Sequence, residues 1–255
     1  MTNSILNYFA LPVDASAHGH GIDSLIIWVH VLMLALFVGW LGYFIYVLLR
    51  FNQKRNPKAD YYGVKSHLST YVEGIVALVE AVLLIGFAIP IWAKAVQEFP
   101  KEEDSKVIRI VAQQFQWNGR YPGKDGKFGA AGLQFLTDEN KFGLDKNDPL
   151  GKDDFVATQT LTVPVDEPVI CYISSLDVIH SFKIVPLRVT QDAIPGLVIP
   201  AHFTAKQIGE YNINCAQLCG NSHYGMKGYL KVVSKEDYAK WVTEQSKGGA
   251  ATSFE

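Results

Sequence analysis

The sequence is most informative in the stretch Cys215-Ala-Gln-Leu-Cys-Gly-Asn-Ser-His-Tyr-Gly-Met226. It holds two thiols, an imidazole and a thioether within twelve residues, and a second imidazole, His180, precedes it on a strand-like run. Soft sulfur ligands with imidazole select copper over hard cations, and this combination is typical of electron-transfer sites. One thiolate is enough for a mononuclear site, so the second cysteine, Cys219, indicates two metal ions bridged by sulfur. The stretch therefore predicts a copper centre.

Two other interpretations of these cysteines stay open. A structural zinc site also uses thiolates and imidazoles, but zinc does not favour the thioether of Met226, and Cys-x2-Cys is its commoner spacing. A disulfide between Cys215 and Cys219 can form in an oxidising compartment. It would leave both histidines and Met226 without a role. The third cysteine, Cys171, lies in an apolar run and is predicted to be a small buried hydrophobic residue rather than a ligand.

Two motifs around these residues resemble those of subunit II of the haem-copper oxidases. One is Asp177-Val-Ile-His-Ser-Phe182, and the other is the Cys-x3-Cys-x3-His-x2-Met pattern that ends at Met226. The resemblance extends over roughly residues 25–242. It implies a binuclear CuA centre, held by a cupredoxin-like domain. The copper ligands that it implies are His180, Cys215, Gln217, Cys219, His223 and Met226.

The resemblance also implies how these ligands divide between the two ions. The two cysteines would bridge both ions, and His180 and Met226 would complete one of them. His223 and the backbone carbonyl of Gln217 would complete the other. The family has a glutamate at the position of Gln217, and its side chain also reaches a magnesium ion at the border with subunit I. Gln217 carries no charge, so the sequence leaves this magnesium site in doubt.

Two apolar runs near the N-terminus are long enough to cross a membrane. Residues 25–49 contain no Asp, Glu, Lys or Arg, and residues 71–92 contain only Glu73 and Glu80. At 1.5 Å per residue, each run reaches or exceeds the roughly 30 Å hydrocarbon core. The loop near residues 50–70 is rich in Lys and Arg, so the positive-inside rule places it in the cytoplasm. The copper domain is then expected on the outer side.

The predicted location is a bacterial inner membrane, with the copper domain in the periplasm. The first residues show neither a basic n-region nor a small-residue cleavage site after a short apolar core, so we expect no cleaved signal peptide. Nothing in this segment resembles an organelle transit peptide. The chain is therefore predicted to be a multi-pass protein that lies in lipid.

Carboxylates inside a membrane span are functional candidates because a charge in lipid is costly. Glu73 falls on the family's glutamate at the mouth of a proton path of subunit I, so the resemblance implies proton uptake there. Glu80 stands where the family usually has proline and inherits no role. The alternative for each is a carboxyl group near the interface or hydrogen-bonded to a neighbouring subunit.

After about residue 106 the sequence changes to short alternating apolar runs separated by Gly, Pro and Asp. They predict an antiparallel sandwich or barrel, with strands at residues 107–112, 160–163, 169–173, 180–184, 211–214 and 228–233. Such a scaffold would hold the ligand loop between two strands and present His180 from a third. The predicted fold class is an α+β membrane protein, in which a two-helix transmembrane hairpin precedes an extramembrane cupredoxin-like Greek-key β-barrel.

The sequence divides into four predicted parts. They are an outer N-terminal segment (1–24), the helix hairpin (25–93), the copper domain (94–242) and a flexible tail (243–255). Within the copper domain, residues 119–159 are polar and rich in glycine. A solvated loop is the main interpretation of this insert, and a docking role for an electron donor is the alternative.

A further family motif concerns electron input. In the family an aromatic cluster begins the domain, and its first tryptophan accepts electrons from cytochrome c. Here the cluster reads Gln114-Phe-Gln-Trp117, so Phe115 takes that position and Trp117 the second one. Core packing is the alternative for Trp117. The net charge of the chain is only −2, which predicts weak steering of a basic donor and favours a donor that is tethered or held in a supercomplex.

These features favour the electron-input subunit of a cytochrome c oxidase. It would accept electrons from a c-type cytochrome and pass them to haem in subunit I, within a proton-translocating complex that reduces oxygen to water. The alternatives are the copper subunit of a CuA-type nitric oxide reductase and a non-redox, membrane-anchored copper carrier. The complete ligand set disfavours a quinol oxidase. No Cys-x2-Cys-His motif for a fused c-type haem is present, and no feature indicates nucleic-acid binding.

Overall fold

The structure is a computed structural model that describes residues 11–58, 61–63 and 65–247. The chain divides into two compact units. One is mainly Gly21–Lys94, and the other combines Pro12–His20 with Ala95–Glu255. The predictions for residues 1–10 and for the tail from residue 248 lie outside the described residues.

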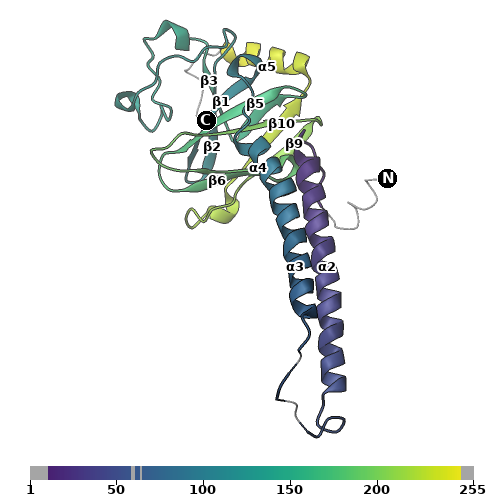
Figure 1. Cartoon of the computed structure of the whole chain (residues 1–255). Coiled ribbons are helices and arrows are strands. Elements are labelled where there is room, and N and C mark those ends of the chain that lie inside the picture. Colours follow the sequence, from purple (N-terminus) through teal and green to yellow (C-terminus); the bar gives the residue numbers. More distant parts are fainter. Residues whose placement is uncertain (1–10, 59–60, 64, 248–255) are drawn as a thin grey trace. The chain divides into compact units, whose positions relative to one another are not determined.

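The first unit consists of two long helical segments joined by a loop (Figure 1). Helix α2 spans Gly19–Arg50. The second segment comprises α3 (Leu68–Ala81), the π-helical η1 (Val82–Ala88) and α4 (Ile89–Val96). Both segments are long and apolar enough to cross a membrane. This agrees with the two predicted spans, although α2 begins six residues before residue 25.

The π-helical segment has a cause in the sequence. Pro90 has no N–H to donate to the carbonyl four residues earlier, and its ring clashes with that carbonyl in a regular α-helix. Wider turns relieve this conflict. The π-helical turns end at Ala88, immediately before the segment that contains Pro90.

The second unit is a sandwich of two five-stranded sheets. The first sheet has the order β3-β2-β1-β5-β8, with β1 Lys106–Gln113, β2 Gln116–Tyr121, β3 Phe155–Thr158, β5 Pro168–Ser175 and β8 Ile199–Thr204. The second has the order β4-β10-β9-β6-β7, with β4 Thr160–Pro164, β6 His180–Ile184, β7 Val189–Ala193, β9 Gly209–Cys215 and β10 Lys227–Val233. Helix α5 (Lys235–Ser246) follows β10, so ordered structure extends four residues past the predicted boundary at 242.

The fold class is confirmed, because two apolar helices precede a β-sandwich domain. The predicted sandwich is present, but its two sheets are mixed rather than purely antiparallel. Strand β1 pairs with β5 in parallel, and β10 pairs with β4 in parallel. Both pairs join strands that are distant in the sequence, and the intervening chain supplies the long crossover connection that a parallel pair needs.

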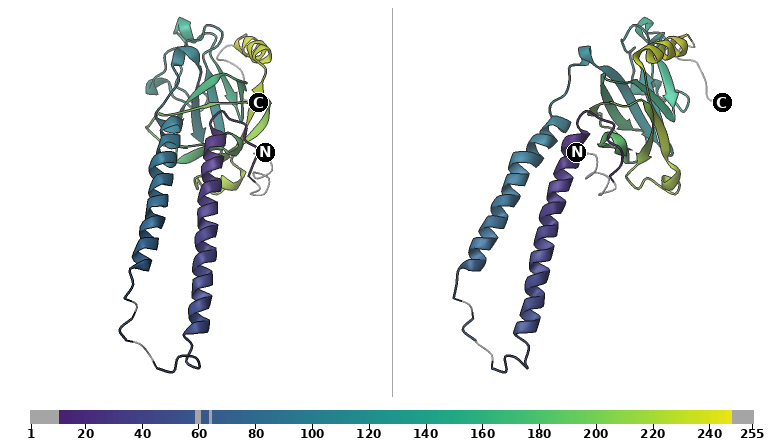
Figure 2. Two further views of the ribbon diagram at one scale, coloured as in Figure 1. Left: turned by 45° about the vertical axis from the view of Figure 1, so that its right-hand side comes forward. Right: turned by 90° about the vertical axis from the view of Figure 1, so that its right-hand side faces the viewer.

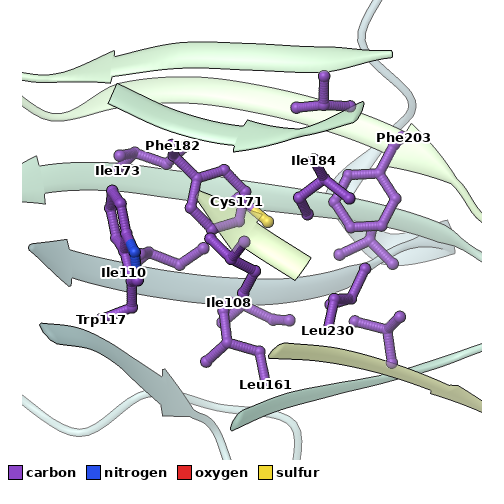
Figure 3. Close-up of a cluster of buried hydrophobic side chains, with 14 of the residues drawn as sticks. Ile108, Ile110, Trp117, Leu161, Cys171, Ile173, Phe182, Ile184, Phe203 and Leu230 are labelled. Carbon is purple, nitrogen blue, oxygen red and sulfur yellow. The ribbon is translucent and has the colours of Figure 1, made fainter. Parts of the chain in front are cut away.

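The core lies between the two sheets (Figure 3). Apolar side chains from both sheets meet there, among them Ile108 and Ile110 of β1 and Phe182 and Ile184 of β6. Cys171 is only 1% exposed, which confirms that it is a buried hydrophobic residue. Burial raises the pKa of its thiol to about 12. Cys171 is therefore a neutral component of the core.

The insert between β2 and β3 is held by its own polar side chains. Arg120 and Asp154 form an ion pair whose side chains are 1% and 0% exposed, and Arg120 also donates to the Gly129 carbonyl at 2.6 Å. Asp153 accepts from the backbone N–H of Lys124 at 2.6 Å. The acidic residues of the insert thus stabilise its turns. Two short 3-10 helices lie within it, η3 (Leu133–Phe135) and η4 (Pro149–Gly151).

A short segment before α2 belongs to the sandwich. Ala15 is fully buried; its N–H donates to the Pro186 carbonyl at 2.9 Å, and its carbonyl accepts from the Lys206 N–H at 2.7 Å. Arg188 donates from Nη2 to the Pro12 carbonyl at 2.7 Å. Part of the predicted outer segment is therefore an integral component of the β-sheet unit.

Candidate metal centre

Three strands place the predicted ligands. Strands β9 and β10 are antiparallel neighbours, and residues 216–226 connect them. The N–H of Cys215, the last residue of β9, donates to the carbonyl of Met226 at 3.3 Å. Strand β6 pairs with the other edge of β9, with Phe182 opposite Cys215. His180, the first residue of β6, is thereby brought next to the ligand loop.

Cys215 contacts three of the other predicted ligands. Its sulfur lies 3.7 Å from the sulfur of Cys219 and 3.9 Å from Nδ1 of His180. Its thiol also donates to the carbonyl of Gln217 at 3.1 Å. His180, Cys215 and Cys219 together form a group that could hold a metal ion, with ligand atoms within 4.8 Å of one another.

Cys219 contacts the remaining two predicted ligands, His223 and Met226. Its sulfur lies 3.4 Å from Nδ1 of His223 and 3.6 Å from the sulfur of Met226. His223 lies in a 3-10 turn, η6 (His223–Gly225), that directs the chain back toward β10. All six predicted ligand positions therefore converge on one pair of sulfur atoms. Both cysteines are free thiols.

Three of the six ligand positions are buried, whereas Cys215 and His223 are partly exposed and Gln217 is exposed. His180, Met226 and Cys219 are 0%, 2% and 3% exposed. Burial, together with the hydrogen bond to Cys215, raises the pKa of the Cys219 thiol to about 11. The metal-free thiol is thus neutral at physiological pH, and metal binding must displace its proton.

Asp177 orients His180, a role that the sequence analysis missed. Its Oδ1 lies 2.8 Å from Nε2 of His180, which leaves Nδ1 directed at Cys215. Burial alone would raise the pKa of Asp177, but hydrogen bonds from the Gln114 N–H, from His180 and from the Val178 N–H outweigh it and lower the pKa. Such carboxylate partners fix the ring of a metal-binding histidine. The three-residue spacing between Asp177 and His180 was the available signal.

The structure places the two predicted electron-input residues differently. Trp117 is fully buried. Its ring makes edge contacts with the rings of His180 and Phe182, with centroid distances of 6.2 Å and 5.3 Å. Phe115 is half-buried in the turn between β1 and β2, close to Gly220 of the ligand loop. Trp117 is thus a core residue behind the site, and Phe115 lies at its edge. Glu73 belongs to the helical unit, on α3.

A sandwich domain with two cysteines, two histidines and a methionine at one site, attached to two helices of membrane-spanning length, defines a class of membrane-anchored metalloproteins. Residues 107–233 match the family described as cytochrome c oxidase subunit II, periplasmic domain. The alternative cytochrome c oxidase subunit 2 of Bradyrhizobium diazoefficiens is 32% identical over 202 residues, which are 78% of this chain and 71% of that protein. The cytochrome c oxidase subunit 2 of Cereibacter sphaeroides is 31% identical over 239 residues, which are 90% of this chain and 76% of that protein.

Among solved structures, the periplasmic domain of subunit II of the Bradyrhizobium japonicum cytochrome oxidase is similar, with a TM-score of 0.44 and 27% identity. The match covers 60% of this chain and 100% of that one. From the sequence matches, the chain belongs to the cytochrome c oxidase subunit II family, whose members are copper-binding components of haem-copper oxidases. The resemblance seen in the two motifs is thereby confirmed.

Proposed function

We propose that this chain is the electron-input subunit of a cytochrome c oxidase. It receives electrons from a c-type cytochrome at a binuclear CuA centre and passes them to haem in subunit I, where oxygen is reduced to water. The observation that carries this proposal is the convergence of six ligand positions on two sulfur atoms 3.7 Å apart. When bound, the two copper ions would share one unpaired electron between them.

The positions of the terminal ligands support two ions. His180 and the Gln217 carbonyl approach the sulfur of Cys215, whereas His223 and Met226 approach that of Cys219. Each proposed ion thus has one terminal ligand beside Cys215 and one beside Cys219. For one ion these are His180 and Met226, and for the other they are Gln217 and His223. Two copper ions would thus find terminal ligands beside both sulfurs. A single zinc ion would not use all of these ligands.

The scaffold suits electron transfer because it limits movement of the ligands. His180 is held by its strand and by Asp177, and the ligand loop is held at both ends by the β9 and β10 pairing. Phe115, half-buried beside the loop, is the proposed point where the donor contacts the domain. Trp117 supports His180 from behind.

The helical unit supplies the proposed membrane anchor and the surface for subunit I. The loop between α2 and α3 would face the cytoplasm and the sandwich the periplasm of a bacterial cell. Compared with the unmodified protein, a Lys54→Cys variant should gain reactivity with a membrane-impermeant maleimide in inside-out vesicles and gain none in intact cells. Glu73 is proposed to assist proton uptake, so Glu73→Gln should slow turnover while copper reduction by the donor stays fast.

The neutral Gln217 leaves a magnesium ion at the subunit I border in doubt.

Paramagnetic resonance tests the proposed centre directly. The full chain, loaded with copper and half-reduced, should bind two coppers and show a seven-line copper pattern, because one electron is shared by two equivalent nuclei. A four-line pattern, or one copper per chain, would contradict the binuclear centre.

A further inference from the structure

Gln114 connects the β1–β2 turn with both halves of the metal site. Its side-chain Nε2 donates to the carbonyl of Cys219 at 2.7 Å. Its backbone N–H donates to Oδ2 of Asp177 at 2.7 Å, and the other oxygen of Asp177 contacts His180 at 2.8 Å. One residue outside the ligand set therefore contacts the ligand loop directly and the histidine of β6 through a single carboxylate.

Gly220, which follows Cys219 in the ligand loop, shows how closely the β1–β2 turn and the loop pack. A Cβ atom on Gly220 would lie 2.6 Å from Nε2 of Gln114 and 3.1 Å from the ring of Phe115. Real Cβ atoms essentially never come within 3.0 Å of another heavy atom, so a side chain at Gly220 would displace the Gln114 carboxamide and crowd the Phe115 ring. Gly220 also has φ +133°, a conformation that favours glycine. The close approach of turn and loop thus depends on glycine at this position.

We infer that Gln114 is a positioning residue, whose carboxamide holds the Cys219 end of the ligand loop against the turn that carries Phe115. A largely buried backbone carbonyl needs a donor, and the amide N–H of Gln114 supplies it. Because Phe115 follows Gln114 in the chain, the same hydrogen bond fixes the proposed electron-accepting ring beside the proposed copper centre. This inference rests on the proposed function only in its copper-dependent part.

The side chain of Gln114 can be replaced by one of similar length that lacks the donor. In the full chain, Gln114→Met should remove the hydrogen bond to Cys219 while the backbone bond to Asp177 remains. In the metal-free protein, amide hydrogen exchange in residues 215–226 should become about five-fold faster, as expected for the loss of one hydrogen bond. Exchange in the core strand β5 should stay unchanged, which shows that the fold is intact.

Gln116→Met is the matched control. It makes the same chemical change two residues away, at the start of β2, where the side chain has no hydrogen bond to the ligand loop in the described part of the chain. Exchange in residues 215–226 of this variant should match that of the unmodified protein. Equal exchange in Gln114→Met and Gln116→Met would overturn the inference.

Copper-loaded protein provides a readout that a purely structural residue would not move. The amide dipole of Gln114 points its positive end at Cys219 and favours the reduced, more negative centre. Gln114→Met should therefore lower the reduction potential and release copper to a chelator about five-fold faster, with no change in Gln116→Met. An unchanged potential together with unchanged copper release would contradict the positioning role.

Gly220→Ala tests the same contact from the loop. It should displace the Gln114 amide and reproduce the faster exchange, and the double variant should show much less than the combined effect of the two single changes. Fully additive effects would overturn the inference. If the unmodified chain binds no copper, the proposed function fails, whereas the exchange measurements on metal-free protein still decide the role of Gln114.

Discussion

Cys219 lies at the centre of the candidate metal site. Its sulfur lies within 3.7 Å of three other ligand atoms, and its carbonyl accepts the hydrogen bond from Gln114. Met226, in contrast, approaches the cluster through a single sulfur contact with Cys219. The two side chains should therefore contribute unequally to the centre.

Replacement of these two residues should separate their roles. A thioether is a weak axial ligand that mainly tunes the potential, so Met226→Leu should keep both coppers and shift the reduction potential. Cys219→Ser removes a bridging thiolate and should abolish the seven-line resonance. The measurement is copper content and paramagnetic resonance of the full chain. Equal copper loss in both variants would contradict this ranking.

The insert between β2 and β3 is a mostly exposed, irregular segment, in agreement with the solvated loop predicted from the sequence. It was predicted to be a solvated loop with a possible docking role for a donor. Its acidic residues accept hydrogen bonds within the insert, as Asp153 does from Lys124 and Asp154 from Gly129 at 3.1 Å. These contacts favour a structural role for the acidic residues. The buried pair of Arg120 and Asp154 is the fixed point of this element.

Removal of one partner of this pair should be costly. Arg120→Met leaves the Asp154 carboxylate buried without its cation, and such changes destabilise proteins by about 3–5 kcal/mol. Lys127→Met, an exposed change in the same insert, should have little effect. Urea unfolding of the two variants gives the comparison. A loss below about 1 kcal/mol for Arg120→Met would show that the pair is not fixed in solution.

The strands that the sequence predicted are those with alternating or continuous apolar residues. Strand β2 was missed because nearly every position is buried, including the polar Asn118 and Arg120, so its pattern does not alternate. Strand β8 was missed because Pro200 interrupts it, which is tolerated since β8 lies at a sheet edge. The ligand positions could be predicted because five of them share one loop and motif, and His180 lies in a second short motif. The role of Gln114 could not be predicted, because it depends on contacts with residues distant in the sequence. The role of Asp177 had only its three-residue spacing from His180 as a signal.

The charge of the whole molecule and its arrangement bear on the donor. The net charge is −2. In the sandwich, the ligand loop and helix α5 lie at opposite ends (Figures 1 and 2), and the insert begins at the end of β2 that is remote from Phe115. Its acidic residues are therefore poorly placed to attract a donor to Phe115. Apolar contact, supported by tethering, is therefore the proposed means of docking for the donor.

Two measurements follow for electron input. Phe115→Ala should slow copper reduction by the native donor and leave the copper spectrum unchanged, because Phe115 lies beside the ligands but is not one of them. Raising the salt concentration should change the rate little, since exposed charges more than about 8–10 Å apart are already screened at physiological salt. A steep fall in rate with salt would show instead that local charges guide the donor.

The parallel pairing of β4 with β10 has a consequence for biosynthesis. The second sheet cannot be completed until β10, the last strand to leave the ribosome, has joined β4 and β9. Non-local pairings of this kind form late, because long loops must close first. Cys215 and Met226 are brought together only by this last strand. Loading of the proposed metal centre is therefore expected to follow synthesis of β10, because a truncated or stalled chain would lack the strand that holds Met226 beside Cys215.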